Sequence, residues 1–184
     1  MNKKYRVIIS GGGTAGHIFP AISIAEELSH VSNNLDILFV GAKGRMEMKK
    51  IPLLGYKIIG LWIDGIQRKW DVRNLIFPIK LFISFIHSFI IIINYRPNIV
   101  IGTGGFASGP IVFIAALLGV PTLIHEQNSF PGLSNRLLGR IVKKICVAYK
   151  NMELYFPSKK IVKTGNPIRK SLKKKINKIT SASY

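Results

Sequence analysis

The chain has 184 residues, of which 48% are hydrophobic and 19% are charged, and its formal net charge is +19. This length fits one domain with a real core, and this composition excludes a chain that is disordered throughout. A single cysteine, Cys146, excludes an intrachain disulfide and a cysteine-based metal cluster, and is expected to be a buried strand residue. The start MNKKYRVIIS has no signal-peptide pattern, so we expect a protein of the cytoplasm or its membrane face.

Short apolar runs alternate with helical patterns along nearly the whole chain. The pattern predicts strands at residues 5–10, 36–41, 56–61, 98–103, 121–126, 144–149 and 160–165, and helices at 18–30, 44–53, 73–95, 109–118 and 131–140. Continuous apolar strands between helices are typical of a doubly wound parallel sheet, so we expect an α/β, Rossmann-like fold. We expect this domain to span residues 1–168 and a basic linker or tail to occupy residues 169–184.

Positive charge is dense toward the carboxyl-terminal end. From Lys143 onward the sequence has twelve Lys or Arg residues and a single acidic residue, Glu153. Such a run fits an anionic surface, a nucleic-acid patch or a solvated tail. The sequence has no helix-turn-helix, zinc-finger or RNA-binding motif, so we expect no nucleic-acid partner.

The segment NLIFPIKLFISFIHSFIIIIN, residues 74–94, is nearly long enough to cross a bilayer. Its polar residues Lys80, Ser84, His87 and Ser88 fall on one narrow helical stripe. We interpret the segment as a helix of the fold whose surplus apolar surface lies on a membrane, where nearby cations meet anionic headgroups. Those cations are Arg68, Lys69, Arg73 and Lys80. A fully buried core helix and a true membrane span are the alternatives.

Two glycine-rich loops follow predicted strands and lead into predicted helices. The first is GGGTAGHIFPAI at residues 11–22, and the second is GTGGFASGP at residues 102–110. Glycines let the backbone approach a ligand closely, and a helix amino terminus offers unpaired N–H groups to a phosphate or a developing negative charge. If their strands are neighbours, both loops open into one crevice. Residues 11–16 have the G-x-G-x-x-G spacing, but no acid ends the second strand to hold a ribose, so NAD binding is not expected.

A third polar segment, HEQNSFPGLSNRLLGR, occupies residues 125–140 and begins at the end of another predicted strand. It places His125, Glu126, Gln127 and Asn128 in four consecutive positions. Polar side chains this dense at the end of an apolar strand favour a site over a scaffold.

These three motifs, together with TGNPIR at residues 164–169, resemble the amino-terminal half of the MurG family of bacterial N-acetylglucosaminyltransferases. The resemblance covers about residues 5–170 and implies the acceptor-binding domain of a GT-B glycosyltransferase. It implies transfer of N-acetylglucosamine from UDP-GlcNAc to lipid I, with inversion, to form lipid II in peptidoglycan synthesis. It also implies a peripheral protein on the cytoplasmic face of the inner membrane. The family's donor-binding carboxyl-terminal domain is absent from the sequence, so a separate domain of that kind is an expected partner.

Inverting transfer needs a base that takes the acceptor proton and groups that stabilise the departing UDP. His17 is the first candidate base, because a helix amino terminus disfavours the imidazolium form, and Glu126 is the alternative. No D-x-D pair is present to hold a metal against a pyrophosphate, so we expect metal-independent chemistry without a cofactor.

The resemblance also assigns binding positions. The donor-binding positions are Thr14, Ala15, Gly16, Asn128 and Arg169. The acceptor and pyrophosphate positions are Gly104, Gly105, Ser108 and His125. Three functions stay open at this point: an enzyme half that needs a donor-binding half, a non-catalytic membrane subunit that binds the acceptor, and an inactive remnant.

Overall fold

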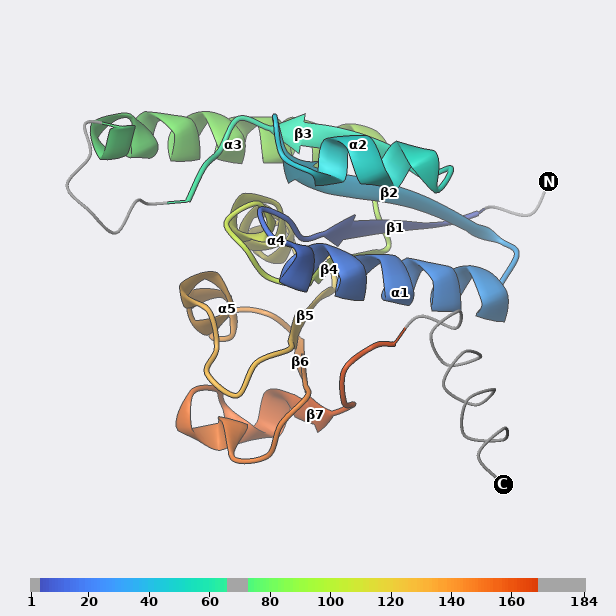
Figure 1. The fold of residues 1–184 in the computed structure, drawn as a ribbon, viewed down its shortest axis with the longest axis vertical. Coiled ribbons are helices and arrows are strands. Elements are labelled where there is room, and N and C mark those ends of the chain that lie inside the picture. The colour runs from blue at the N-terminus through green and yellow to red at the C-terminus, as the bar shows by residue number, and fades with distance from the viewer. Residues whose placement is uncertain (1–3, 66–72, 169–184) are drawn as a thin grey trace, which may run out of the picture.

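The computed structural model describes residues 4–65 and 73–168. It contains a seven-stranded parallel sheet in the order β3-β2-β1-β4-β5-β6-β7, with helices on both faces (Figure 1). The strands are β1 (Tyr5–Ser10), β2 (Leu35–Ala42), β3 (Lys57–Leu61), β4 (Ile99–Gly102), β5 (Thr122–Glu126), β6 (Lys144–Val147) and β7 (Ile161–Lys163). The helices are α1 (Ala15–Val31), α2 (Glu47–Leu53), α3 (Arg73–Tyr95), α4 (Ser108–Leu117) and α5 (Leu133–Leu138), with short 3-10 turns η1 (Met152–Leu154) and η2 (Ser158–Lys160). The predicted doubly wound α/β fold is confirmed.

Two separate apolar cores explain why the strands read as continuous apolar runs. Val7 and Ile9 of β1 pack in the core beneath α1 and α2, whereas Ile8 between them packs in the core beneath α3, α4 and α5. Because successive strand residues face opposite sides of the sheet and both sides are covered, the consecutive central positions Val7, Ile8 and Ile9 are all apolar. Cys146, in β6, is half-buried.

The element bounds differ from the predictions at several ends. The helix predicted from residue 44 begins at Glu47, because Gly44 adopts a φ of 74°, in the left-handed region that interrupts a right-handed helix. Helix α1 begins at Ala15, earlier than predicted, so Pro20 lies inside the helix. The predicted tail at residues 169–184, with Arg169, lies outside the described residues.

The order of strands reverses between β1 and β4, which is the switch point of the sheet. Ser10 and Gly102, the last residues of these strands, are register partners. The two glycine loops therefore leave the sheet side by side, at the position where ligands bind in open α/β sheets.

Helix α3 turns its polar stripe toward the protein. Ser84 and Ser88 are completely buried, and the Ser84 hydroxyl donates to the Trp62 carbonyl at 3.2 Å. The rings of Phe85 and Phe113 lie 5.3 Å apart and pack α3 against α4. The stripe that the sequence identified is thus the inner face of α3, and the helix is a part of the fold.

The outer face of α3 is apolar and exposed. Large side chains on it are between 39% and 75% exposed, namely Leu75, Ile76, Ile79, Phe82, Ile83, Ile86, Phe89, Ile90 and Ile93. The alternative of a fully buried core helix is therefore wrong. By length and composition alone, residues Asn74–Tyr95 are also long and apolar enough to cross a membrane. Arg68, Lys69 and the side chain of Arg73, which were expected beside this face, lie outside the described residues.

Candidate functional site

The two glycine loops pack directly against each other at the switch point. Thr103 donates its backbone N–H to the Ser10 carbonyl at 2.8 Å and its hydroxyl to the His17 carbonyl at 2.7 Å. A Cβ atom at Gly105 would collide with the Gly12 carbonyl oxygen, and one at Gly11 with the Thr103 hydroxyl. The predicted convergence of the loops is confirmed, and glycine is needed because the two backbones leave no room for side chains.

His17 lies where the loops meet. Its Nδ1 is 3.1 Å from the Thr103 carbonyl oxygen, and its ring packs against the backbone of Gly104 and Gly105. A carbonyl only accepts hydrogen bonds, so the neutral ring carries its proton on Nδ1 and presents an unprotonated Nε2. Nε2 has no hydrogen-bond partner among the described residues, and the side chain is half-exposed. This geometry suits a proton acceptor.

The first turn of α1 faces solvent beside His17. Thr14, Ala15 and Gly16 are all exposed, and Thr14 is the N-cap residue without a capping hydrogen bond from its side chain. The Thr14 carbonyl accepts the N–H groups of His17 and Ile18. The unpaired N–H groups of a helix start and its partial positive charge suit an anionic ligand.

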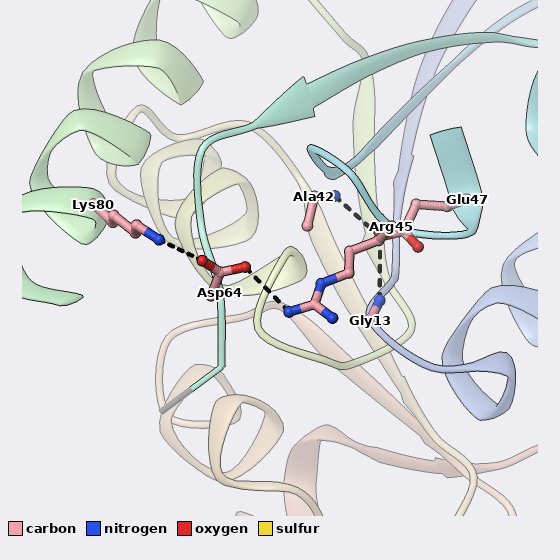
Figure 2. Close-up of polar contacts among 6 residues, drawn as sticks. All are labelled: Gly13, Ala42, Arg45, Glu47, Asp64 and Lys80. Atoms are coloured by element: carbon pink, nitrogen blue, oxygen red, sulfur yellow. Dashed lines mark hydrogen bonds and ion pairs between the residues drawn. The ribbon is translucent and has the colours of Figure 1, made fainter. Parts of the chain in front are cut away.

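Glu47 holds the first glycine loop in place through hydrogen bonds. The sequence did not identify it as a site residue. Its Oε1 accepts the Gly13 N–H at 3.1 Å and the Ala42 N–H at 3.0 Å, which ties the loop to the end of β2 (Figure 2). The residue is completely buried, and its Oε2 has no partner among the described residues. Because Glu47 lies in a helix far along the chain from Gly13, no local sequence signal connects the two residues.

The second loop offers backbone groups to the same crevice. Gly104 and Gly105 have φ values of 97° and 80°, in the region that favours glycine. The buried Ser108 hydroxyl donates to the Gly105 carbonyl at 3.0 Å and so fixes the turn into α4. Ser108 therefore shapes this loop with its side chain instead of presenting its hydroxyl to the crevice.

Glu126 is the centre of a buried hydrogen-bond cluster. Its Oε1 accepts the backbone N–H and the side-chain amide of Asn128, each at 3.0 Å. Its Oε2 accepts the Gly132 N–H at 3.2 Å and the Asn135 side-chain amide at 2.9 Å. Glu126 is 1% exposed, so this carboxylate holds the segment between β5 and α5 in shape.

His125 also uses both ring nitrogens within the chain. Nε2 donates to the Gly165 carbonyl at 2.9 Å, and Nδ1 accepts from the Gln127 amide at 3.1 Å. Burial, the largest cause, lowers the pKa of His125 despite the opposing effects of the Gly165 hydrogen bond and the Glu126 charge. A buried neutral imidazole of this kind fastens the segment after β7 to the carboxyl end of β5.

Three charged side chains from different segments of the chain meet beside the second glycine loop. Asp64, which follows β3, accepts from Arg45 Nη2 at 3.1 Å and from Lys80 Nζ of α3 at 2.5 Å (Figure 2). The hydrogen bond from Lys80, the largest cause, lowers the pKa of Asp64 together with Arg45, while burial acts in the opposite direction. Among residues 4–65 and 73–168, no cluster of His, Cys, Asp and Glu could hold a metal ion.

An open parallel sheet with two glycine loops at its switch point defines a Rossmann-type domain. The crystal structure of MurG from Acinetobacter baumannii agrees in fold, with a TM-score of 0.76 and 29% sequence identity over 90% of this chain and 47% of that one. Residues 7–147 match the model of the glycosyltransferase family 28 N-terminal domain. The chain belongs to this family.

Curated relatives extend this similarity. A Flavobacterium psychrophilum protein named UDP-N-acetylglucosamine--N-acetylmuramyl-(pentapeptide) pyrophosphoryl-undecaprenol N-acetylglucosamine transferase is 54% identical, over 92% of this chain and 46% of its own length. A Bacteroides thetaiotaomicron protein of the same name is 53% identical, over 95% of this chain and 47% of its own length. The resemblance to the MurG family is thereby confirmed. The chain spans about half the length of the curated relatives it matches.

Proposed function

We propose that this chain is the acceptor-binding half of an inverting glycosyltransferase that transfers N-acetylglucosamine from UDP-GlcNAc to lipid I and forms lipid II. The observation that carries the proposal is the position of His17, with Nε2 unprotonated at the meeting point of two glycine loops. The names of the relatives supply the reaction, and their greater length supports the need for a donor-binding half.

His17 acts as the base in this proposal. The Thr103 carbonyl holds the Nδ1 proton, so Nε2 can take the proton of the acceptor hydroxyl as that oxygen attacks the anomeric carbon. The imidazolium formed keeps its hydrogen bond to Thr103. Glu126, although the alternative base from sequence, has both carboxylate oxygens occupied by four hydrogen bonds, which favours His17.

The other site residues divide between binding and positioning. Thr14, Ala15 and Gly16 present a helix start to the donor, and Gly104 and Gly105 offer backbone N–H groups to the acceptor. The binding roles of Asn128 and Arg169 rest on the resemblance alone. We assign His125, Glu126 and Ser108 to positioning, because their hydrogen-bonding groups are engaged within the chain.

Reconstitution tests this function. The purified chain would be incubated with lipid I and labelled UDP-GlcNAc, alone and with the separately expressed carboxyl-terminal domain of the F. psychrophilum relative. We expect lipid II only in the mixture. A folded chain that binds lipid I without any turnover in the mixture indicates the alternative function, a non-catalytic acceptor-binding subunit. A folded chain without binding or turnover indicates an inactive remnant.

We further propose that the outer face of α3 rests on the cytoplasmic surface of the inner membrane, so that the protein is peripheral. An amphipathic helix normally turns its apolar face inward, whereas α3 buries its serines and exposes Phe82 and Ile86. A bilayer interface is the environment that suits such a face. Residues 1–168 then form one membrane-docked domain, to which residues 169–184 add a basic linker.

Sedimentation with lipid vesicles measures this contact. Phe82→Asn and Ile86→Asn should each weaken binding about fivefold, because each removes about 1 kcal/mol of apolar transfer. Leu53→Asn is a matched control, since Leu53 is an 85% exposed apolar residue on α2. Equal effects in all three variants would contradict the assignment of the surface to α3.

A further inference from the structure

The Arg45–Asp64–Lys80 cluster beside the second glycine loop has more cations than carboxylates. Its two cations share one carboxylate, so the cluster keeps a net charge of +1. The side chains of Arg45 and Asp64 are 41% and 38% exposed, whereas that of Lys80 is 18% exposed. The cluster is therefore accessible from solvent, and its side chains come from three segments: the loop before α2, the loop after β3, and α3.

Two aromatic rings fix the cations of the cluster. The Arg45 guanidinium lies 5.6 Å from the centre of the Phe106 ring, and Lys80 Nζ lies 5.4 Å from the centre of the Trp62 ring. Phe106 belongs to the second glycine loop, and its ring lies so close to Gly13 that a Cβ atom there would collide with it. Arg45 thus stacks on a ring of the second glycine loop that itself packs against the first.

The cluster lies between the two surfaces that a lipid-linked sugar must reach. On one side, Lys80 comes from α3, the helix with the exposed apolar outer face. On the other side, Phe106 leads to the loops that hold His17. In a membrane-borne acceptor the diphosphate connects the lipid to the sugar. When the lipid is at α3 and the sugar is at His17, the diphosphate therefore lies between them.

We infer that Arg45 and Lys80 bind the diphosphate of the membrane-borne acceptor, and that Asp64 is their counterion only until the diphosphate displaces it. This inference rests on the proposed function. A guanidinium and an ammonium suit a multiply charged phosphate group, because charge-assisted hydrogen bonds to both cations replace those to one carboxylate. The N–H groups of Gly104 and Gly105 are then left for the part of the acceptor nearest His17.

The direction in which binding changes when the Asp64 charge is removed distinguishes two possible roles of Asp64. A residue that merely orients Arg45 and Lys80 would weaken binding when removed. A carboxylate that competes with the diphosphate for the same cations would strengthen binding when neutralised. Asp64→Asn keeps the shape and a hydrogen-bond acceptor while removing the charge, so it separates these two roles.

The experiment measures how the full chain binds phosphatidylcholine vesicles of three kinds. One kind carries lipid I, the second carries undecaprenyl diphosphate, and the third carries phosphatidylglycerol at matched negative charge. We expect the wild-type chain to prefer the first two over the third. Arg45→Gln and Lys80→Gln should each reduce this preference about tenfold, whereas Asp64→Asn should increase it.

Two exposed cations on other parts of the surface provide matched controls. Arg140→Gln and Lys57→Gln remove the same charges from Arg140, which precedes β6, and from Lys57, which begins the edge strand β3. Both should keep the preference for diphosphate. Thermal unfolding of each variant establishes that its fold is intact.

The outcomes separate this inference from the proposed function. If the wild-type chain prefers lipid I vesicles and the Arg45 and Lys80 variants keep that preference, the assignment of the diphosphate to these cations is wrong while the acceptor role stands. Weaker binding by Asp64→Asn would also overturn the assignment. If the wild-type chain does not distinguish lipid I from phosphatidylglycerol, the acceptor role fails and this inference fails with it.

Discussion

Two histidines at the carboxyl edge of the sheet have opposite environments. His17 uses Nδ1 for the Thr103 carbonyl and leaves Nε2 without a partner among the described residues, at a half-exposed position. His125 is 4% exposed, and both of its ring nitrogens are bonded, to Gly165 and to Gln127. A histidine at this edge of the sheet thus suits proton transfer at position 17, whereas at position 125 it holds two segments of the chain together.

The difference shows that polar density does not by itself identify a reactive group. The His125–Asn128 segment is richer in polar side chains than the first glycine loop, yet its carboxylate and imidazole are engaged within the chain. The ring nitrogen that has no hydrogen-bond partner among the described residues, Nε2 of His17, lies instead in the first glycine loop. Four substitutions test this difference between the two histidines and the carboxylates beside them.

The largest expected effect follows from His17→Ala. Loss of a general base should reduce kcat of the reconstituted enzyme by about 10²–10⁴-fold and leave the midpoint of urea unfolding nearly unchanged. Steady-state transfer assays and urea titrations measure the two quantities. His30→Ala, an exposed histidine at the end of α1, is the control. A His17 variant with more than half of the wild-type kcat would remove His17 from the chemistry.

Glu126→Ala should act mainly on stability. It leaves four buried or partly buried donors without their acceptor, so we expect a loss of about 3 kcal/mol in the free energy of unfolding. Urea unfolding followed by circular dichroism gives this value. Glu153→Ala, at an exposed position in η1, should cost almost nothing. An intact fold combined with complete loss of turnover would instead restore Glu126 as a candidate base.

Glu47→Gln tests the support beneath the first loop. The amide oxygen can still accept from Gly13 and Ala42, but its NH₂ group replaces a carboxylate oxygen that has no partner, so a buried donor is left unsatisfied. We expect a loss of about 1 kcal/mol in the free energy of unfolding. Denaturant titration measures it. An increase in stability would mean that the buried charge itself is unfavourable.

The smallest expected effect is the pH dependence contributed by His125. Because burial lowers its pKa in the folded state, the unfolded chain binds the proton more readily. The contribution of His125 to the free energy of unfolding therefore has its full value above the ordinary histidine pKa of about 6.5. This contribution decreases as the pH falls below that value. Urea midpoints at a series of pH values should show a shallower acid decline for His125→Gln than for the wild-type chain. An unchanged slope would contradict a neutral, buried His125.

The sequence was sufficient to predict the parallel sheet and the convergence of its two glycine loops. Continuous apolar strands predict a sheet that is covered on both faces, and the rules for parallel sheets bring the loops after β1 and β4 together. His17 was predicted as a candidate base because it falls in the first turn of a helix that follows glycines, and its catalytic role stays a prediction. These predictions use local patterns and a general rule of topology.

The remaining parts of the site depend on contacts between distant segments. Glu47 contacts Gly13 from another helix, and the Asp64 cluster joins side chains from two loops and α3, so neither leaves a pattern in the sequence. The stripe of α3 was visible as a periodicity, but a period does not say which face turns inward. Only the burial of Ser84 and Ser88 decided that the polar face is the inner one.

The outward apolar face of α3 also has a consequence for the proposed membrane contact. Helix α3 connects two parallel strands, β3 and β4, and so runs antiparallel to them along the sheet. In the proposed contact with a bilayer, the strands run along the membrane plane and the glycine loops lie beside the lipid surface. The proposed lipid-linked acceptor would then reach His17 by lateral diffusion in two dimensions, without leaving its leaflet.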